Sequence, residues 1–152
     1  MSDEVRLYGP ADRGECLRLF DGNVPAFFAA GERAAFEAFL DQAAQQCAYR
    51  AVLRDGRIVA CGGHALEPDG RTVSLCWGMV DPGLQRTGIG TALTLARLEA
   101  ARSLPGTARI RLDTSQHTQG FYARFGFEAE AVTQDGYAPG LDRWEMILNL
   151  RT

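Results

Sequence analysis

Alternating apolar and polar residues, interrupted by segments with helical spacing, predict a chain that mixes strands with helices. In the segment Thr72–Val80 every second residue is apolar, and these side chains are expected to share one face of a strand: Val73, Leu75, Trp77 and Met79. The other expected strands are Val5–Tyr8, Ala48–Arg54, Arg57–Gly63, Ala108–Asp113, Phe127–Val132 and Trp144–Leu150. The expected helices begin at Ala11, Glu32, Gly88 and Ser115, and Thr133–Asp142 is expected to be a long hairpin loop.

The segment Met79–Thr91, MVDPGLQRTGIGT, joins the end of a strand to the start of the predicted helix Gly88–Ser103. Because Gly88 and Gly90 have no side chains, successive backbone N–H groups can turn toward one point at the helix start, where the macrodipole is positive. The segment therefore predicts a phosphate-binding loop. The following strand is expected to lie parallel to the first, which places the loop at the strand ends where α/β sheets bind ligands.

Composition narrows the choice of partner and compartment. With 152 residues, of which 46% are apolar and 23% charged, the chain is expected to form one domain, residues 1–152. A net charge of -3 and scattered basic residues argue against nucleic-acid binding and favour a small-molecule partner. The four cysteines lack a C-x-x-C pair, no apolar stretch could cross a bilayer, and the first residues do not resemble an export signal. A cytoplasmic protein with free thiols, and with no membrane contact and no metal, is expected.

Two common phosphate-binding motifs do not fit the glycine loop. Leu93 stands where the dinucleotide fingerprint G-x-G-x-x-G has its third glycine, and no acidic residue is a clear candidate for the ribose contact. A P-loop would need a Lys-Ser or Lys-Thr pair after the glycines, which this loop lacks. A nucleotide-binding α/β module stays as an alternative, which tight binding of ADP or NAD without coenzyme A binding would favour.

Two motifs together resemble those of the GCN5-related N-acetyltransferase (GNAT) superfamily. Gln85–Gly90, QRTGIG, matches the Q/R-x-x-G-x-G/A motif of that superfamily, and Phe121–Phe127, FYARFGF, matches its F/L-Y-x-x-x-G-F motif. The order of elements also agrees over the whole chain. The resemblance implies a single-domain acyl-CoA N-acyltransferase fold of mixed α/β class, with a central, mostly antiparallel sheet of about six to seven strands, a splayed parallel pair at the cofactor site and about four flanking helices.

The resemblance also implies an activity, the transfer of an acetyl group from acetyl-CoA to a primary amine through a tetrahedral intermediate. Backbone N–H groups of Arg86–Thr91 would hold the pyrophosphate, Met79 and Val80 would lie along the pantetheine arm, and an N–H near Val80 would polarise the thioester carbonyl. Tyr122 would protonate the departing thiolate, and its alternative role is that of a packed aromatic side chain. The implied cofactor-binding residues are Met79, Val80, Gln85, Arg86, Thr87, Gly88, Ile89, Gly90, Thr91 and Ser115.

The general base is not identified by the sequence. Many members of the superfamily use a glutamate on the strand before the cofactor loop, but Thr72–Val80 contains no carboxylate. Water relays and the side chains of His64, Glu67 and Asp113 are the candidates, and each of the three also has a purely structural alternative. The missing glutamate favours a second function, an acyl-CoA-binding sensor without turnover.

The amine acceptor also stays open. Resemblance places substrate contacts at Asn23, Phe27 and Phe28 and in the segment Thr133–Asp142, which contains Tyr137. Acidic residues that could attract a cationic amine are Glu32, Asp135 and Asp142. A homodimer is an expectation from resemblance alone.

Overall fold

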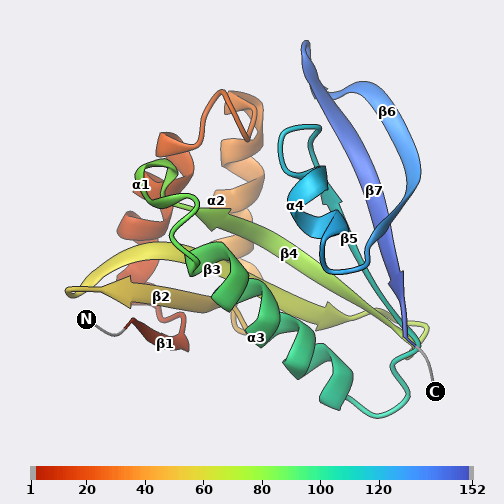
Figure 1. Ribbon diagram of the computed structural model, residues 1–152. Coiled ribbons are helices and arrows are strands. Elements are labelled where there is room, and N and C mark those ends of the chain that lie inside the picture. Colours follow the sequence, from red (N-terminus) through yellow and green to blue (C-terminus); the bar gives the residue numbers. More distant parts are fainter. Residues whose placement is uncertain (1–2, 151–152) are drawn as a thin grey trace.

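The strands expected from alternation form one sheet in the computed structural model, which describes residues 3–150 (Figure 1). Within these residues the sheet has seven strands in the order β1-β2-β3-β4-β5-β7-β6, and all neighbours are antiparallel except the parallel pair β4 and β5. The strands are β1 (Glu4–Leu7), β2 (Arg50–Arg54), β3 (Arg57–Leu66), β4 (Thr72–Val80), β5 (Arg109–Thr114), β6 (Glu128–Ala138) and β7 (Leu141–Asn149). The helices are α1 (Arg13–Gly22), α2 (Arg33–Gln42), α3 (Ile89–Ser103) and α4 (Gln119–Ala123). The mixed α/β fold expected from the sequence is confirmed.

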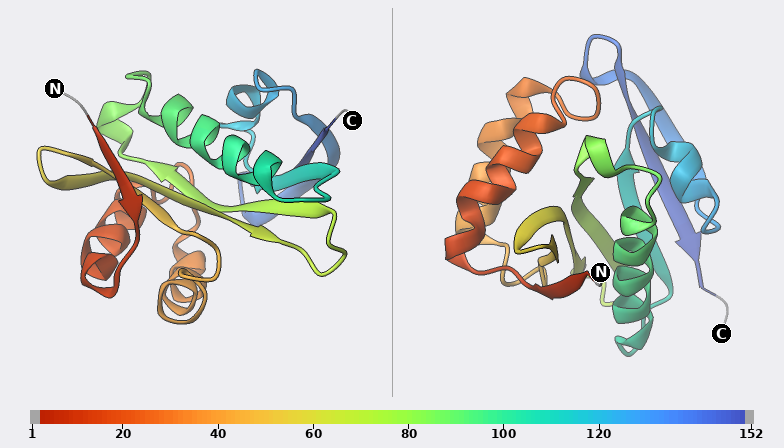
Figure 2. Two further views of the ribbon diagram at one scale, coloured as in Figure 1. Left: turned by 90° about the horizontal axis from the view of Figure 1, so that it is seen from below. Right: turned by 60° about the vertical axis from the view of Figure 1, so that its left-hand side comes forward.

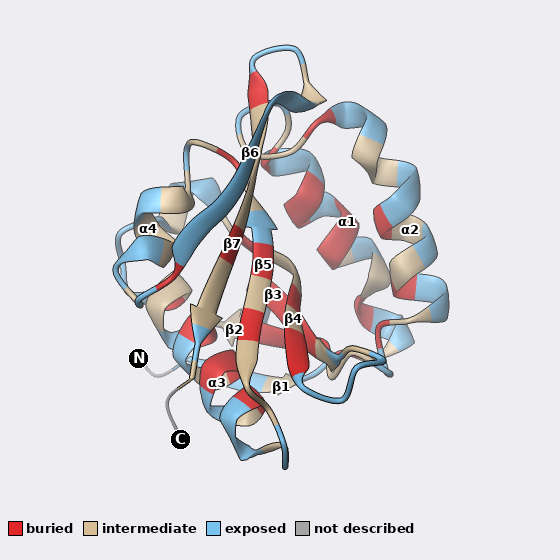
Figure 3. Cartoon of the chain, turned by 90° about the vertical axis from the view of Figure 1, so that its right-hand side faces the viewer, coloured by how far each residue is buried: buried red, intermediate tan, exposed pale blue. Residues whose placement is uncertain are grey.

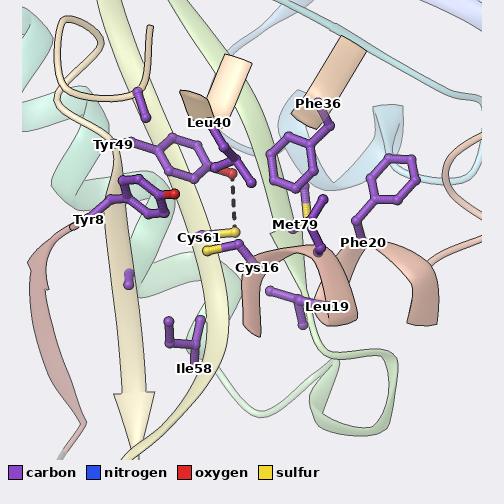
Figure 4. Packing of buried hydrophobic residues seen from close by; sticks show 13 residues of the cluster. Tyr8, Cys16, Leu19, Phe20, Phe36, Leu40, Tyr49, Ile58, Cys61 and Met79 are labelled. Atoms are coloured by element: carbon purple, nitrogen blue, oxygen red, sulfur yellow. Dashed lines mark hydrogen bonds between the residues drawn. The ribbon is translucent and has the colours of Figure 1, made fainter. Parts of the chain in front are cut away.

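Helices cover both faces of the sheet, α1 and α2 on one side and α3 and α4 on the other (Figure 2). Under α1 and α2, buried residues such as Phe20, Phe36 and Tyr49 form one apolar cluster (Figure 4). On the opposite face α3 packs against β3 and β4, and Leu98 and Ile110 belong to a second cluster that reaches β7. Buried residues concentrate on the central strands, whereas the edge strand β6 is largely exposed (Figure 3). No helix in residues 3–150 combines the length and the apolarity needed to span a bilayer.

A β-bulge in β4 overturns the expectation that its four apolar residues share one face. Gly63 pairs with Cys76 and Cys61 with Met79, so β4 carries one more residue than β3 between these pairs, and Trp77 has a positive φ of 46°. The extra residue shifts the alternation. The residues before the bulge, Val73 and Leu75, pack in the cluster beneath α3, whereas Trp77 and Met79 pack with α1 and α2.

The expected long loop between the last two strands is also wrong, because β6 and β7 continue through it and only Pro139 and Gly140 separate them. The backbone N–H of Asp135 donates to Oδ1 of Asp142 at 2.9 Å, and that of Gly140 donates to Oδ1 of Asp135 at 2.7 Å. These polar side chains thus hold together a bulged hairpin, although their sequence lacks the apolar alternation of a strand.

Candidate active site

A cavity opens where β4 and β5 separate. The two strands pair only from Thr72 to Ser74, and within residues 3–150 no strand pairs with this edge of β4 from Leu75 to Val80. The cavity beside the free edge has a volume of about 870 Å³, which is in the usual range for small-molecule sites. Backbone N–H and C=O groups on a free strand edge can pair with an extended ligand as another strand would. The separation of β4 and β5 therefore leaves backbone N–H and C=O groups of β4 free to bind a long, thin molecule.

The glycine loop presents the N-terminus of α3 to this cavity. Gly88 is the N-cap of α3 with a left-handed φ of 90°, a conformation that is costly for any residue with a Cβ atom. The N–H groups in the first turn of a helix lack intrahelical partners. Within the described chain no side chain caps this terminus, so these N–H groups can bind an anion. The residues of the loop that line the cavity are Gln85, Arg86, Gly88, Gly90 and Thr91.

The other two residues of the predicted loop have different surroundings. The hydroxyl of Thr87 donates to the carbonyl oxygen of Leu84, which closes the turn before the helix. The side chain of Ile89 is buried in a cluster with Val52 and Leu93. Neither residue is among those that line the cavity, so any contact with a ligand there would come from the backbone.

The end of β4 lines the cavity through Met79 and Val80, and two side chains fix its backbone. The hydroxyl of Tyr49 donates to the carbonyl oxygen of Trp77 at 2.7 Å and lies 3.1 Å from the sulfur of Cys61 (Figure 4). The Nδ2 group of Asn23 donates to the carbonyl oxygens of Leu19 at 2.8 Å and Val80 at 3.2 Å. Asn23, predicted as a substrate contact, thus ties α1 to the end of β4 and also lines the cavity.

Tyr122 lines the same cavity from α4. Its ring packs edge-on against Phe121, with ring centroids 5.1 Å apart, and against Phe127 at 6.0 Å. Ser115, also in the cavity wall, is buried, and its hydroxyl oxygen accepts a hydrogen bond from the backbone N–H of His117 at 3.2 Å. The structure therefore brings the glycine loop and the tyrosine of the two sequence motifs to one cavity, together with Ser115.

The sequence analysis missed Arg97, a buried arginine that lines the cavity from α3. Its Nη2 group donates to the hydroxyl oxygen of Tyr122 at 3.3 Å. The pattern of α3 contains a signal, because Arg97 lies four residues after Leu93 and four before Ala101, on the stripe that packs against the sheet. An arginine on an otherwise apolar stripe indicates a specific role for its charge.

Aromatic side chains line another part of the cavity. Phe28 stacks on Trp77, with ring centroids 6.0 Å apart, and Phe27 packs edge-on against His117 at 6.2 Å. Because His117 precedes α4 and Phe27 follows α1, this contact connects the two sides of the cavity. Phe27 and Phe28, predicted as substrate contacts, therefore both lie in its wall.

Of the three base candidates, the structure brings only Asp113 to the cavity, where Arg143 Nη2 lies 2.9 Å from its Oδ2. Glu67 instead accepts a hydrogen bond from the hydroxyl of Ser74. Nδ1 of His64 accepts from Nη1 of Arg50 at 3.2 Å, since a guanidinium can only donate. Burial, followed by the charges of Arg50 and Arg97, lowers the pKa of His64.

Glu32 and Tyr137 add ionisable groups to the cavity wall. Burial raises the pKa of Glu32, although its carboxylate accepts the backbone N–H of Ala29 at 2.8 Å, which has the opposite effect. Burial also raises the pKa of the Tyr137 hydroxyl, and the negative charges of Asp113 and Glu32 add to this shift. Within residues 3–150 Glu32 forms no ion pair. Its carboxylate is thus available to a cationic ligand.

Comparisons with known proteins agree with the fold of this chain. A GNAT-family structure from Desulfovibrio desulfuricans is 26% identical and has a TM-score of 0.81 over 97% of this chain and 99% of that chain. The ribosomal-protein-S18-alanine N-acetyltransferase of Escherichia coli is 18% identical, with a TM-score of 0.77 over 99% of this chain and 96% of the other. A Salmonella typhimurium protein with its cofactor acetyl-CoA is 17% identical, with a TM-score of 0.77 over 100% and 96% of the two chains. The last two likenesses concern the fold alone.

Curated protein sequences contain no match to this chain. The model of the acetyltransferase (GNAT) family, in contrast, matches residues 16–127, which include the glycine loop, Tyr122 and most of the cavity wall. This match extends over far more than half of the sequence, and the chain therefore belongs to the GNAT family of acetyltransferases.

Proposed function

We propose that this protein transfers an acetyl group from acetyl-CoA directly to a primary amine. The observation that carries the proposal is a single cavity lined by the uncapped start of α3, the free edge of β4 and Tyr122. An anion site, a strand edge and a proton donor are the three features that a phosphorylated thioester donor requires. Membership of the family and the acetyl-CoA bound to the Salmonella typhimurium relative support the choice of donor.

The residues present fit acetyl-CoA. Backbone N–H groups of Arg86–Thr91 hold its pyrophosphate at the positive end of α3, and Gln85 lies beside them in the cavity wall. The main chain of Met79 and Val80 pairs with the amides of the pantetheine arm at the free edge of β4. A backbone N–H near Val80 polarises the thioester carbonyl, and Ser115 contacts the donor from the opposite strand end.

Acetyl-CoA supplies the thioester carbon that the amine attacks. Side chains and water accept the proton of the amine and donate a proton to the departing sulfur. For an amine with a pKa of about 10.4, reaching the free base at pH 7 costs roughly 4.6 kcal/mol, so water or a side chain must accept its proton. Asp113 is the candidate base that lies in the cavity. Tyr122 acts as general acid and protonates the sulfur as the carbon–sulfur bond breaks.

The proposed acceptor is a cationic amine that enters beside Phe27, Phe28 and Asn23. Aromatic faces attract a cation through their quadrupole, and the half-buried carboxylate of Glu32 adds a negative charge to the same cavity. Attraction of the protonated amine brings it to the site before its proton is removed. The residues of the cavity wall therefore support a cationic amine as the acceptor class.

Replacing Glu32 with glutamine is expected to raise KM for the amine about fivefold, or about 1 kcal/mol, because the charge that attracts the cation is lost. Glutamine keeps an oxygen for the Ala29 N–H, so the turn before α2 should survive. Steady-state kinetics with a cationic amine measures the effect, and Kd for acetyl-CoA should stay unchanged. Glu37→Gln is the matched control, since Glu37 pairs with Arg33 and does not line the cavity. Equal KM values for wild type and Glu32→Gln would contradict the acceptor site.

Calorimetric titration with acetyl-CoA, combined with an assay for free thiol on a panel of amines, tests the proposed function. Saturable binding with thiol release on one amine would support it and name the acceptor class. Binding without release on a broad panel would favour the acyl-CoA sensor. Failure to bind acetyl-CoA, with tight binding of ADP or NAD, would contradict the proposal and favour the nucleotide-binding alternative.

A further inference from the structure

The side chain of Arg97 is buried without a countercharge. It is 2% exposed, and within residues 3–150 its guanidinium lies in no ion pair. Its hydrogen bond to the hydroxyl oxygen of Tyr122 is 3.3 Å long, and its buried Nε has no partner in the described chain. Since a buried charge without a partner is unfavourable, such a residue indicates a function that uses the charge.

Two glycines on neighbouring strands make the space that the guanidinium occupies. A Cβ atom at Gly62 on β3 would lie 3.1 Å from Nη1 of Arg97, and one at Gly78 on β4 would lie 2.9 Å from both Nη1 and Nη2. With the guanidinium in this position, neither glycine has room for a Cβ atom at an ordinary contact distance. The niche thus lies between β3, β4 and α3, where the guanidinium is buried.

Within residues 3–150, the ionisable side chains whose pKa the charge of Arg97 shifts carry no negative charge at neutral pH. Burial raises the pKa of the Cys61 thiol well above its usual value and that of Cys76 to about 12, so both thiols are neutral. Burial and the charges of Arg50 and Arg97 lower the pKa of His64, which is therefore neutral as well. The positive charge of Arg97 can therefore stabilise a negative charge that forms during the reaction.

The position of Arg97 excludes the phosphates of the donor as that negative charge. Arg97 lies eight residues after Ile89, the first residue of α3, which is about two helical turns or roughly 12 Å along the axis. The anion site at the start of α3 is thus distant, whereas the oxygen of Tyr122 is in hydrogen-bond contact.

We propose that Arg97 is a positioning residue that makes Tyr122 a directed proton donor and stabilises the tyrosinate left after the transfer. A guanidinium has no acceptor, so the oxygen of Tyr122 must accept the bond and its own proton is free for another acceptor. The inference rests on the proposed acetyl transfer. As the carbon–sulfur bond breaks, its electron pair goes to sulfur, and the proton of Tyr122 moves to that sulfur to give the thiol. The proton lost by the amine returns through water to the tyrosinate, which restores the phenol.

Arg97→Met tests the role, because methionine is flexible, apolar and able to fill the niche without a charge. We expect kcat to fall about tenfold, with Kd for acetyl-CoA and KM for the amine within about twofold of wild type. The melting temperature should stay equal or rise, since an apolar replacement of a buried ion is often neutral or stabilising. Arg97→Lys keeps the charge and should retain more activity than Arg97→Met, provided that thermal melting shows both variants to be folded.

A double-mutant cycle with Tyr122→Phe shows whether Arg97 acts through the tyrosine. We expect the double variant to be about as slow as Tyr122→Phe alone, because the hydroxyl that Arg97 serves is then absent. A structural role for Arg97 would instead give the same fold-loss in both backgrounds.

Three results would overturn the inference. The first is a folded Arg97→Met variant with wild-type kcat, and the second is an equal loss in the Tyr122→Phe background. The third is a loss confined to acyl donors that carry a carboxylate, such as succinyl-CoA, because Arg97 would then bind the acyl group. Wild-type protein that binds acetyl-CoA but releases no thiol would instead overturn the proposed function itself, and the role of Arg97 with it.

Discussion

Replacing Tyr122 with phenylalanine is expected to lower kcat about 100-fold and to leave Kd for acetyl-CoA within about twofold of wild type. The ring packs against Phe121 and Phe127, and phenylalanine preserves both contacts, so the variant removes only the hydroxyl group. Loss of the acceptor for Arg97 should cost about 1 kcal/mol of the free energy of unfolding. Initial rates of thiol release at saturating donor and amine, calorimetry and thermal melting measure the three effects.

Tyr137 offers the matched control for this prediction. It is a second tyrosine in the wall of the same cavity, but no hydrogen bond to Arg97 is present within residues 3–150. Tyr137→Phe should therefore keep kcat within a few-fold of wild type. Equal turnover by Tyr122→Phe and wild type would contradict the general-acid role, and a large loss only in Tyr137→Phe would transfer that role to Tyr137.

The sequence predicted the fold and the conformation of the glycine loop because both depend on local chemistry. Pro82 ends a strand, Gly88 takes a left-handed φ and a helix follows, and each of these steps is determined by residues within one short segment. The Q/R-x-x-G-x-G/A and F/L-Y-x-x-x-G-F motifs then identify the family by their combination. Period-two alternation likewise located the strands of the sheet, since burial of one face requires it.

The bulge at Trp77 was not predictable, because contacts far apart in the sequence determine it. A Cβ atom at Gly78 would lie 2.9 Å from the guanidinium of Arg97 on α3, and Tyr49, the residue before β2, donates a hydrogen bond to the carbonyl of Trp77. Simple alternation therefore assigned Trp77 and Met79 to the wrong face. The importance of Arg97 was not predictable for the same reason, because its proposed role depends on contacts with Gly62, Gly78 and Tyr122, which are distant in the sequence.

Substituting valine for Gly88 is expected to weaken acetyl-CoA binding at least about 30-fold. A β-branched residue at φ 90° costs more than about 2 kcal/mol, so the loop should relax to a negative φ that turns its N–H groups away from the cavity. Binding must then restore the strained conformation, which reduces the affinity by the cost of the strain. Calorimetric titration measures Kd, and the thermal melt shows that α3 still packs on the sheet.

Gly90→Ala separates this effect from a general sensitivity of the loop. A Cβ at Gly90 would meet Phe121 and Val80 at ordinary contact distances of 3.5 Å, and Gly90 is helical without a positive φ. Kd should therefore stay within about twofold of wild type, since the peptide planes need not move. If Gly88→Val bound acetyl-CoA as tightly as wild type, the N–H groups at the start of α3 could not be the main phosphate contact. If both variants lost binding equally, space in the loop, and not the left-handed turn at Gly88, would be the property that the donor requires.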